Sequence, residues 1–311
     1  MKKLARLILG LVVIIVVAVT IFWFSRPADV SFEQYRGNFP NSTYSHFAEV
    51  DGVRIHYQDK GNGTPLILIH GYTSSNYSWK EVFEPLSKTF RVIAPDLKGF
   101  GFSAKPDGDY TRRAQAMLIV HLLDQLGIDK AWLAGSSMGG EVALNVAITN
   151  PQRVAGLILI DSAGAPVAGS GSLAPRYLLV PVLGRLLTAF ALRSDKLVRE
   201  GLTKSFYDDR NVTNERVAAY YVPLKTRGGQ LAALRARTQA GQFPVEPELP
   251  KLAVPTLILW GREDELNPLE AGRKLNSLIR NSKLVIIENC GHLPQEEMPQ
   301  RVIEELTKFK G

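Results

Sequence analysis

Cysteine is almost absent from this chain of 311 residues, in which Cys290 is the single example. One thiol cannot form a disulfide within the chain, and the Cys and His spacings of a metal site do not occur. A nucleotide-binding fingerprint is missing as well. The sequence therefore predicts neither a bound metal nor a cofactor.

Strong charge of either sign is also lacking in most of the chain. The net charge is +7, but the first 26 residues hold four basic residues and no acidic one, which leaves 33 Lys or Arg against 30 Asp or Glu in the rest. The sequence has no basic stripe interleaved with aromatic residues and no nucleic-acid motif. We therefore expect no nucleic acid among the partners.

One long apolar run stands out at the N-terminus, where residues 7–24 carry no charge over eighteen positions. At about 1.5 Å per residue a helix of this length roughly crosses the ~30 Å hydrocarbon core of a bilayer. Lys2, Lys3 and Arg6 precede the run, and Trp23 lies near its far end. We expect residues 1–26 to be a single-pass membrane anchor, with the N-terminus in the cytoplasm and the remainder on the outer, periplasmic or extracellular, side.

A cleaved signal peptide is the alternative, because its first residues would also be basic. The apolar run is longer than the usual ~7 to 15 residues, and no A-x-A-like cleavage site follows Phe24, so the anchor is favoured. Residues 27–45 are polar and contain Pro27, Gly37 and Pro40. We interpret this stretch as a linker between the membrane and a folded domain.

Short apolar segments then alternate with helical patterns. The first pair, 47–50 and 54–57, flanks Asp51-Gly52 and predicts a hairpin. Further strand patterns lie at residues 65–69, 91–94, 131–134, 154–160, 256–260 and 283–287. Helical patterns between and after them lie at 110–126, 141–149, 268–279 and 298–309. This order predicts an α/β fold with a mostly parallel, doubly wound sheet and helices on both faces.

The alternation stops between Gly164 and Pro250, where Gly and Pro separate helical segments, including 177–192 and 215–237. We interpret residues 164–250 as an inserted helical cap. The predicted domain order is therefore a first core part at 46–163, the cap, and a second core part at 251–311.

The segment after the strand pattern at 131–134 reads Gly135-Ser136-Ser137-Met138-Gly139. This G-x-S-x-G spacing between a strand and a helix is that of a nucleophile elbow, a turn so sharp that its neighbours must be small. The helix that follows would offer unpaired N–H groups and a positive dipole end to developing negative charge. Ser137 is therefore the candidate nucleophile.

Five motifs in sequence give the chain its resemblance to a known family. They are His70-Gly71, Asp96-x-x-Gly99-x-Gly101-x-Ser103, the elbow, Trp260-Gly-Arg-Glu-Asp264, and Gly291-His292-Leu-Pro294 with Glu297 and Pro299 after it. In this order they resemble the α/β-hydrolase superfamily, and the resemblance spans residues 47–310 apart from the cap. It implies the α/β-hydrolase fold and a Ser, acid, His order of catalytic residues.

The resemblance assigns roles to three residues. Ser137 would be the nucleophile, His292 the base that takes its proton, and Asp264 the acid that orients His292. Two other acids compete for the last role: Glu263 is adjacent, and Asp161 ends the preceding strand pattern, a place from which some family members recruit their acid.

An oxyanion hole in this family uses two backbone N–H groups, which here would belong to Tyr72 and Met138. The Tyr72 side chain could instead line the pocket or offer its hydroxyl to the substrate. The remaining histidines have simpler interpretations: His70 would fix a loop beside the site, and the others lie in strand or helix patterns (His46, His56, His121).

These assignments predict a membrane-anchored serine hydrolase that cleaves carboxylic esters, esterase- or lipase-like, on a small-molecule or lipid ester. Epoxide hydrolases and haloalkane dehalogenases of this fold use Asp at the elbow, so Ser137 argues against both. The His70-Gly71-Tyr72 run also lacks the HGGPG-like pattern of proline iminopeptidases. Two alternatives stay open: a carbon–carbon bond hydrolase of the ring-fission product type, and a non-catalytic binding module.

Overall fold

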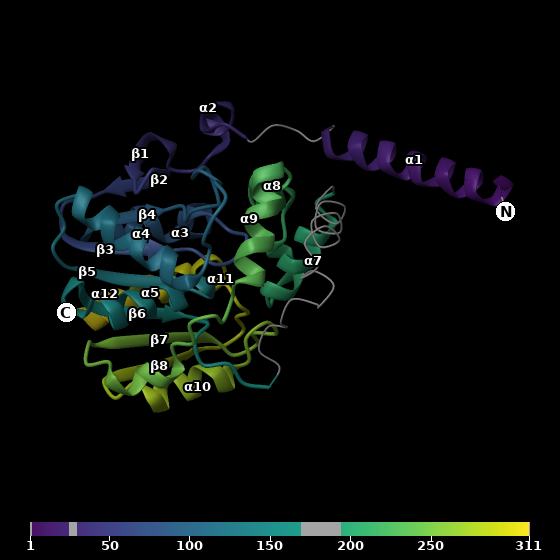
Figure 1. Cartoon of the computed structure of the whole chain (residues 1–311). Coiled ribbons are helices and arrows are strands. Elements are labelled where there is room, and N and C mark those ends of the chain that lie inside the picture. The colour runs from purple at the N-terminus through teal and green to yellow at the C-terminus, as the bar shows by residue number, and fades with distance from the viewer. Residues whose placement is uncertain (1, 25–29, 169–193, 311) are drawn as a thin grey trace.

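A single eight-stranded sheet forms the centre of the molecule (Figure 1), as seen in a computed structural model that describes residues 2–24, 30–168 and 194–310. Its strand order is β1-β2-β4-β3-β5-β6-β7-β8. The strands are β1 (Ser45–Val50), β2 (Val53–Lys60), β3 (Thr64–Ile69), β4 (Phe90–Pro95), β5 (Ala131–Ser136), β6 (Val154–Ile160), β7 (Thr256–Gly261) and β8 (Ser282–Ile287). Both pairings of β2, with β1 and with β4, are antiparallel, and β3 to β8 run parallel. The predicted α/β-hydrolase fold is confirmed.

Helices cover both faces of the sheet (Figure 1). One face carries α4 (Arg112–Gln125), α5 (Met138–Thr149) and α10 (Leu269–Leu278), and the other carries α3 (Lys80–Ser87) and α12 (Pro299–Lys310). Alternation along β3 explains the two layers, since Ile67 and Ile69 join the core on the first face whereas Leu66 and Leu68 join the core on the second. Short turns of helix connect the elements: η3 (Asn76–Trp79), η4 (Pro151–Arg153) and α11 (Pro294–Glu297).

The region predicted as a cap is helical where the structure describes it. It contains α7 (Lys196–Ser205), η6 (Asp209–Asn211), α8 (Asn214–Leu224), α9 (Arg227–Thr238) and η7 (Glu246–Lys251). The predicted helix at 177–192 lies outside the described residues, and the domain boundaries stay a prediction. The helix predicted at 215–237 is two helices, because Thr226 leaves the helical conformation at ψ 160° and caps α9 by accepting a hydrogen bond from the Gly229 N–H (3.2 Å).

Part of the predicted linker is folded onto the domain. Residues 32–44 form α2 (Phe32–Tyr35), η1 (Arg36–Asn38) and η2 (Ser42–Tyr44). Phe32 and Phe39 are buried and pack with ring centroids 5.3 and 5.0 Å from Phe102. Aromatic packing of this kind fixes the end of the linker that adjoins β1.

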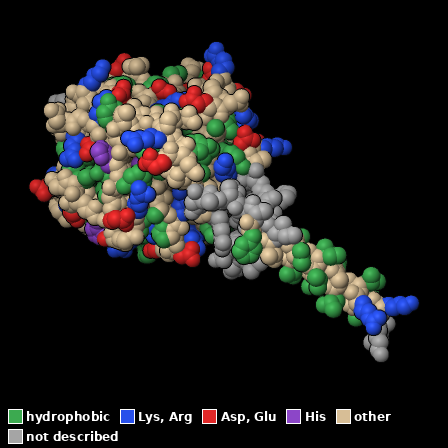
Figure 2. Space-filling model, turned by 90° about the horizontal axis from the view of Figure 1, so that it is seen from above, with side chains coloured by type: hydrophobic (Ala, Val, Ile, Leu, Met, Phe, Trp, Pro, Cys, Tyr) green, Lys and Arg blue, Asp and Glu red, His purple; other side chains and the backbone are tan. Residues whose placement is uncertain are grey.

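The N-terminal apolar run forms a separate helix, α1 (Lys2–Phe24). Its segment Lys3–Thr20 has a mean hydropathy of 2.4 and none of it is buried in the molecule. Figure 2 shows apolar side chains exposed along α1 and basic side chains at its N-terminal end. Length and composition thus suit a membrane span.

Candidate active site

Ser137 lies in a strained turn between β5 and α5, with φ 52° and ψ −118°. The glycines around it are required for close backbone approach. A Cβ atom at Gly135 would lie 2.3 Å from the Gly139 carbonyl oxygen, and one at Gly139 would lie 2.1 Å from that of Ile69. The sharp strand-to-helix turn expected from the sequence is therefore present, and it holds Ser137 at the carboxyl end of the parallel strands.

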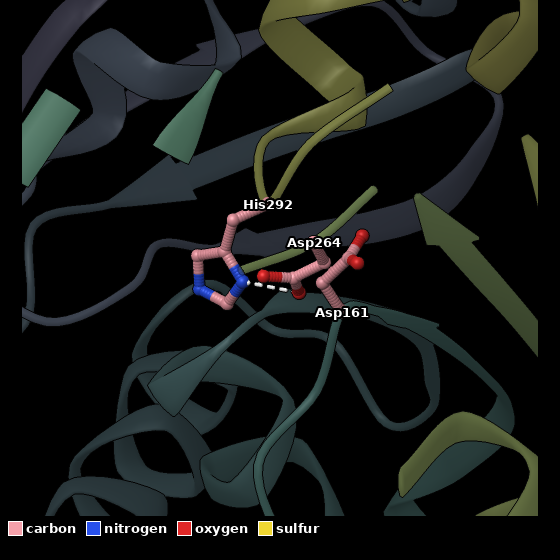
Figure 3. A group of neighbouring side chains, drawn as sticks. All are labelled: Asp161, Asp264 and His292. Atoms are coloured by element: carbon pink, nitrogen blue, oxygen red, sulfur yellow. Dashed lines mark hydrogen bonds and ion pairs between the residues drawn. The ribbon is translucent and has the colours of Figure 1, made fainter. Parts of the chain in front are cut away.

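His292 and Asp264 form a direct pair. Nδ1 of His292 lies 2.6 Å from Oδ2 of Asp264, and both side chains are largely buried. The other carboxylate oxygen, Oδ1, accepts hydrogen bonds from the backbone N–H groups of Leu266 (2.8 Å) and Asn267 (2.9 Å). Figure 3 shows the second ring nitrogen of His292 pointing away from the carboxyl groups. This arrangement fixes the ring and leaves Nε2 available as a base.

Electrostatics keep the Asp264 carboxyl ionised. Burial acts to raise its pKa, but the charge of His292 and the hydrogen bonds from His292 and Asn267 together hold the pKa of Asp264 below its ordinary value. An ionised carboxylate at this place would stabilise an imidazolium at His292, as its predicted role requires.

The loop of His292 adjoins the elbow. Nε2 of Gln295 donates a hydrogen bond of 3.3 Å to the hydroxyl of Ser136, the residue before the candidate nucleophile. In the part of the chain that the structure describes, no hydrogen bond joins the Ser137 hydroxyl to His292. Such bonds are often formed fully only when substrate is bound.

Two backbone N–H groups lie where the oxyanion hole is predicted. Met138 is the first residue of α5, so its N–H has no acceptor within the helix. The Tyr72 N–H has no acceptor among the described residues. Its neighbour Gly71 packs against the elbow, since a Cβ at Gly71 would lie 3.3 Å from Cβ of Ser137.

The Tyr72 hydroxyl is bound to the region predicted as the cap. It donates a hydrogen bond of 2.9 Å to the carbonyl oxygen of Ala233 in α9. Burial raises the pKa of Tyr72 to about 12, so the phenol stays protonated. The structure thus shows a use that the sequence did not suggest: the Tyr72 hydroxyl ties the loop after β3 to α9.

The rival acids accept hydrogen bonds from backbone N–H groups, and the other histidines have partners away from the elbow. Glu263 accepts from the backbone N–H of Cys290 (2.9 Å), and Asp161 accepts from that of Gly261 (3.0 Å). The remaining imidazoles have separate partners: His46 stacks on Tyr57 at 5.4 Å, His56 pairs with Asp96 at 2.7 Å, His70 accepts from the Leu97 N–H at 3.0 Å, and His121 pairs with Asp51 at 2.5 Å. Among the described residues, His292 is thus the histidine paired with an acid beside the elbow.

Glu297 has a structural role that the sequence did not reveal. Its carboxylate accepts hydrogen bonds from the N–H of Gly291 (2.7 Å) and from the cap residues Tyr207 (3.2 Å) and Asp208 (2.8 Å). The sequence motif marked Glu297 as a family feature, but nothing in it indicated a partner some ninety positions away. Glu297 fastens the His292 loop to the cap.

One group could in principle hold a metal ion. Single ligand atoms of Asp161, Asp264 and His292 lie within 4.8 Å of one another, and no other such group occurs in the described ranges. The His292–Asp264 bond already uses one atom of each residue. Within this group, His292 and Asp264 are therefore already paired with each other.

Comparison with known proteins places this geometry in a family. Residues 64–299 match the family model described as the α/β hydrolase fold. A 2-hydroxymuconate semialdehyde hydrolase of Pseudomonas sp. (strain CF600) is 33% identical over 80% of this chain and 88% of its own length. A soluble epoxide hydrolase of Corynebacterium sp. (strain C12) is 33% identical over 85% of this chain and 96% of its own.

Among solved structures, a membrane phospholipase A described as a bacterial virulence factor matches with a TM-score of 0.68 and 29% identity. The match covers 99% of this chain and 98% of that one. With its eight-stranded sheet, strained elbow serine and buried His–Asp pair, this chain belongs to the α/β-hydrolase fold family.

Proposed function

We propose that the protein is a serine hydrolase with a Ser137, His292 and Asp264 triad. The observation that carries the proposal is the 2.6 Å bond from His292 to Asp264, formed in a loop that adjoins the strained elbow of Ser137. A serine hydroxyl is a poor nucleophile unless a base takes its proton, and an oriented imidazole is that base.

The reaction follows from these positions. His292 Nε2 takes the Ser137 proton as the oxygen attacks a carbonyl carbon, and the N–H groups of Tyr72 and Met138 bind the oxyanion. His292 then gives the proton to the leaving group, which departs and leaves an acyl-enzyme. Water, activated by the same imidazole, releases the acid and restores Ser137.

For the bond that is cleaved, the relatives favour a carbon–carbon bond. The 2-hydroxymuconate semialdehyde hydrolase covers 80% of this chain, and such substrates are ring-fission products. A carbon leaving group needs its electron pair delocalised, which a conjugated 2-hydroxy-dienoate allows. We therefore propose hydrolysis of a ring-fission product as the first candidate, ahead of the ester hydrolysis expected from the sequence.

Ester hydrolysis at a membrane is the second candidate, favoured by one specific observation. The match to the membrane phospholipase A extends over 99% of the chain and thus includes α1. An apolar, unburied α1 would hold the domain at a bilayer, the N-terminus inside and the domain outside. A lipid ester would then be within reach of the site.

The test separates catalysis from substrate. A fluorophosphonate probe should label the wild type and not Ser137→Ala, while Ser277→Ala, which changes an exposed serine of α10, should label normally. Equal labelling of the Ser137 variant would overturn the triad. The substrate is then identified with unlabelled wild-type enzyme, by comparing the loss of absorbance of a 2-hydroxy-6-oxo-dienoate with the release of fatty acid from phospholipid vesicles. Turnover of esters without any turnover of the dienoate would reverse our order of candidates.

A further inference from the structure

A third titratable side chain lies beside the His292–Asp264 pair. Asp161 follows β6 and Asp264 follows β7, and these strands are neighbours in the sheet. One ligand atom from each of Asp161, Asp264 and His292 lies within 4.8 Å of the others (Figure 3). The mechanism above gives Asp161 no part, although it is fully buried.

The hydrogen bonds of the two carboxyl groups differ. Both oxygens of Asp264 receive donors, from Leu266, Asn267 and His292. Oδ1 of Asp161 accepts from the Gly261 N–H at 3.0 Å, but Oδ2 is buried and receives no donor among the described residues. A buried carboxylate oxygen without a donor is costly, whereas a carboxylic acid O–H at this place can itself donate.

The charges agree with this assignment. Burial, and after it the charge of Asp264, raise the pKa of Asp161 well above its ordinary value. Two ionised carboxylates this close in a buried site would repel one another, so the pair keeps one proton. The proton belongs on Asp161, because Asp264 has the imidazole and two backbone donors.

We propose that Asp161 is a positioning residue that stays a neutral carboxylic acid and donates a hydrogen bond to Asp264, holding the ionised Asp264 against His292. The inference rests on the proposed roles of Asp264 and His292. It assigns Asp161 neither the part of an acid that orients His292 nor that of a simple turn residue.

Hydrogen bonds and an unusual backbone conformation fix the turn that carries Asp161. Asp161 has φ 42°, a left-handed conformation that is unfavourable for a residue with a side chain. The Asn267 side chain holds the same turn by donating to the carbonyl of Ser162 at 2.9 Å. The next residue, Ala163, donates its N–H to the carbonyl of Ser137 at 3.0 Å. The turn that carries Asp161 therefore also supports the elbow.

Three variants of the full chain in detergent test the inference. The readout is the rate of inactivation by a fluorophosphonate, which is independent of the natural substrate. Asp161→Asn keeps a neutral group that accepts from Gly261 and donates to Asp264, so its rate should stay within about threefold of wild type. Asp161→Ala loses the donor and should fall about tenfold. Asp264→Asn should fall by about 10⁴-fold, because the His292 tautomer is no longer fixed.

Infrared spectroscopy gives a readout that a merely structural role would not change. The difference spectrum between wild type and Asp161→Asn at pH 7 should contain the C=O stretch of a protonated carboxylic acid, shifted in D₂O. The proposal would be overturned if this band were absent from the difference spectrum. It would also be overturned if the inactivation rate fell as far in Asp161→Asn as in Asp264→Asn. Wild-type rates in Asp161→Ala would overturn it too. Failure of the proposed function appears differently, as labelling that survives Ser137→Ala.

Discussion

The backbone N–H of His292 donates a hydrogen bond of 2.7 Å to the carbonyl oxygen of Ser205, the last residue of α7. The candidate base is therefore attached by its own backbone to the region predicted as the cap. Gly291 permits the approach, because a Cβ there would lie 2.5 Å from the same oxygen. Changes in this part of the predicted cap should consequently reach the candidate base.

Glu297 offers the sharpest test of that attachment. In Glu297→Gln the amide NH₂ replaces an oxygen that accepts from the N–H groups of Gly291 and Tyr207. The N–H groups of Gly291 and Tyr207 then face an NH₂ group that cannot accept from them. Leaving a partly buried donor unpaired costs about 1 to 3 kcal/mol. We expect kcat to fall about tenfold with KM changed less, as measured by steady-state kinetics.

The matched control is Glu304→Gln in α12, whose carboxylate forms an exposed pair with Arg301 at 3.8 Å. Exposed pairs of this kind contribute little, so activity and stability should stay at wild-type levels. If both Glu→Gln variants behave alike, Glu297 does not position His292.

A buried carboxyl between cap and core predicts a pH-dependent stability. Glu296 pairs with Arg216 of α8 at 2.9 Å and accepts a hydrogen bond from the Tyr220 hydroxyl. Burial, opposed by the charge of Arg216, raises the pKa of Glu296 to about 7. The folded protein therefore binds the proton more tightly than the unfolded chain, in which the pKa is 4.5.

The sign follows from linkage. Stability supplied by the protonated Glu296 is complete below pH 4.5 and is lost as the pH rises through about 7. A shift of this size corresponds to about 3 kcal/mol. We expect the free energy of unfolding of wild type, measured with urea, to fall between pH 5 and 8 relative to that of Glu296→Gln. Parallel profiles for the two proteins would contradict this.

The sequence could predict what depends on local pattern. The alternation of strand patterns with helical patterns predicted the parallel sheet. The G-x-S-x-G spacing around Ser137 predicted a sharp turn, and the structure shows that this turn needs its glycines. Contacts between distant segments leave no such pattern. The bonds of Glu297 to the cap and the proximity of Asp161 to Asp264 arise only when the chain is folded. Thr226 divides one predicted helix into two because its side chain forms the N-cap of α9. The helical periodicity of the sequence continues across this position and gave no sign of the break.

The glycines of the elbow can be tested against a helical glycine in open space. A Cβ at Gly139 would lie 2.1 Å from the backbone oxygen of Ile69, whereas Gly201 in α7 has no atom within 4 Å of its added Cβ. Gly139→Ala should destabilise the fold by about 3 kcal/mol, because backbone atoms must move. Gly201→Ala should stabilise it by about 0.5 to 1 kcal/mol through helix propensity. Both are measured by urea unfolding, and equal effects would mean that the elbow tolerates a side chain.

The proposed anchor predicts a separable membrane segment. The structure gives α1 no contact that buries Lys3–Thr20 in the molecule, while Phe32 and Phe39 are packed on the domain. A chain that begins at Val30 should therefore keep its fold, since it retains the aromatic contacts and loses only the exposed helix. We expect the full chain to stay with membranes after extraction at alkaline pH and the shortened chain to remain in the supernatant. Both should react with a fluorophosphonate at rates within about threefold, because α1 contributes no residue to the triad. A mature protein whose N-terminal residue lies beyond Phe24, or a full chain found in the supernatant, would show that α1 is no anchor.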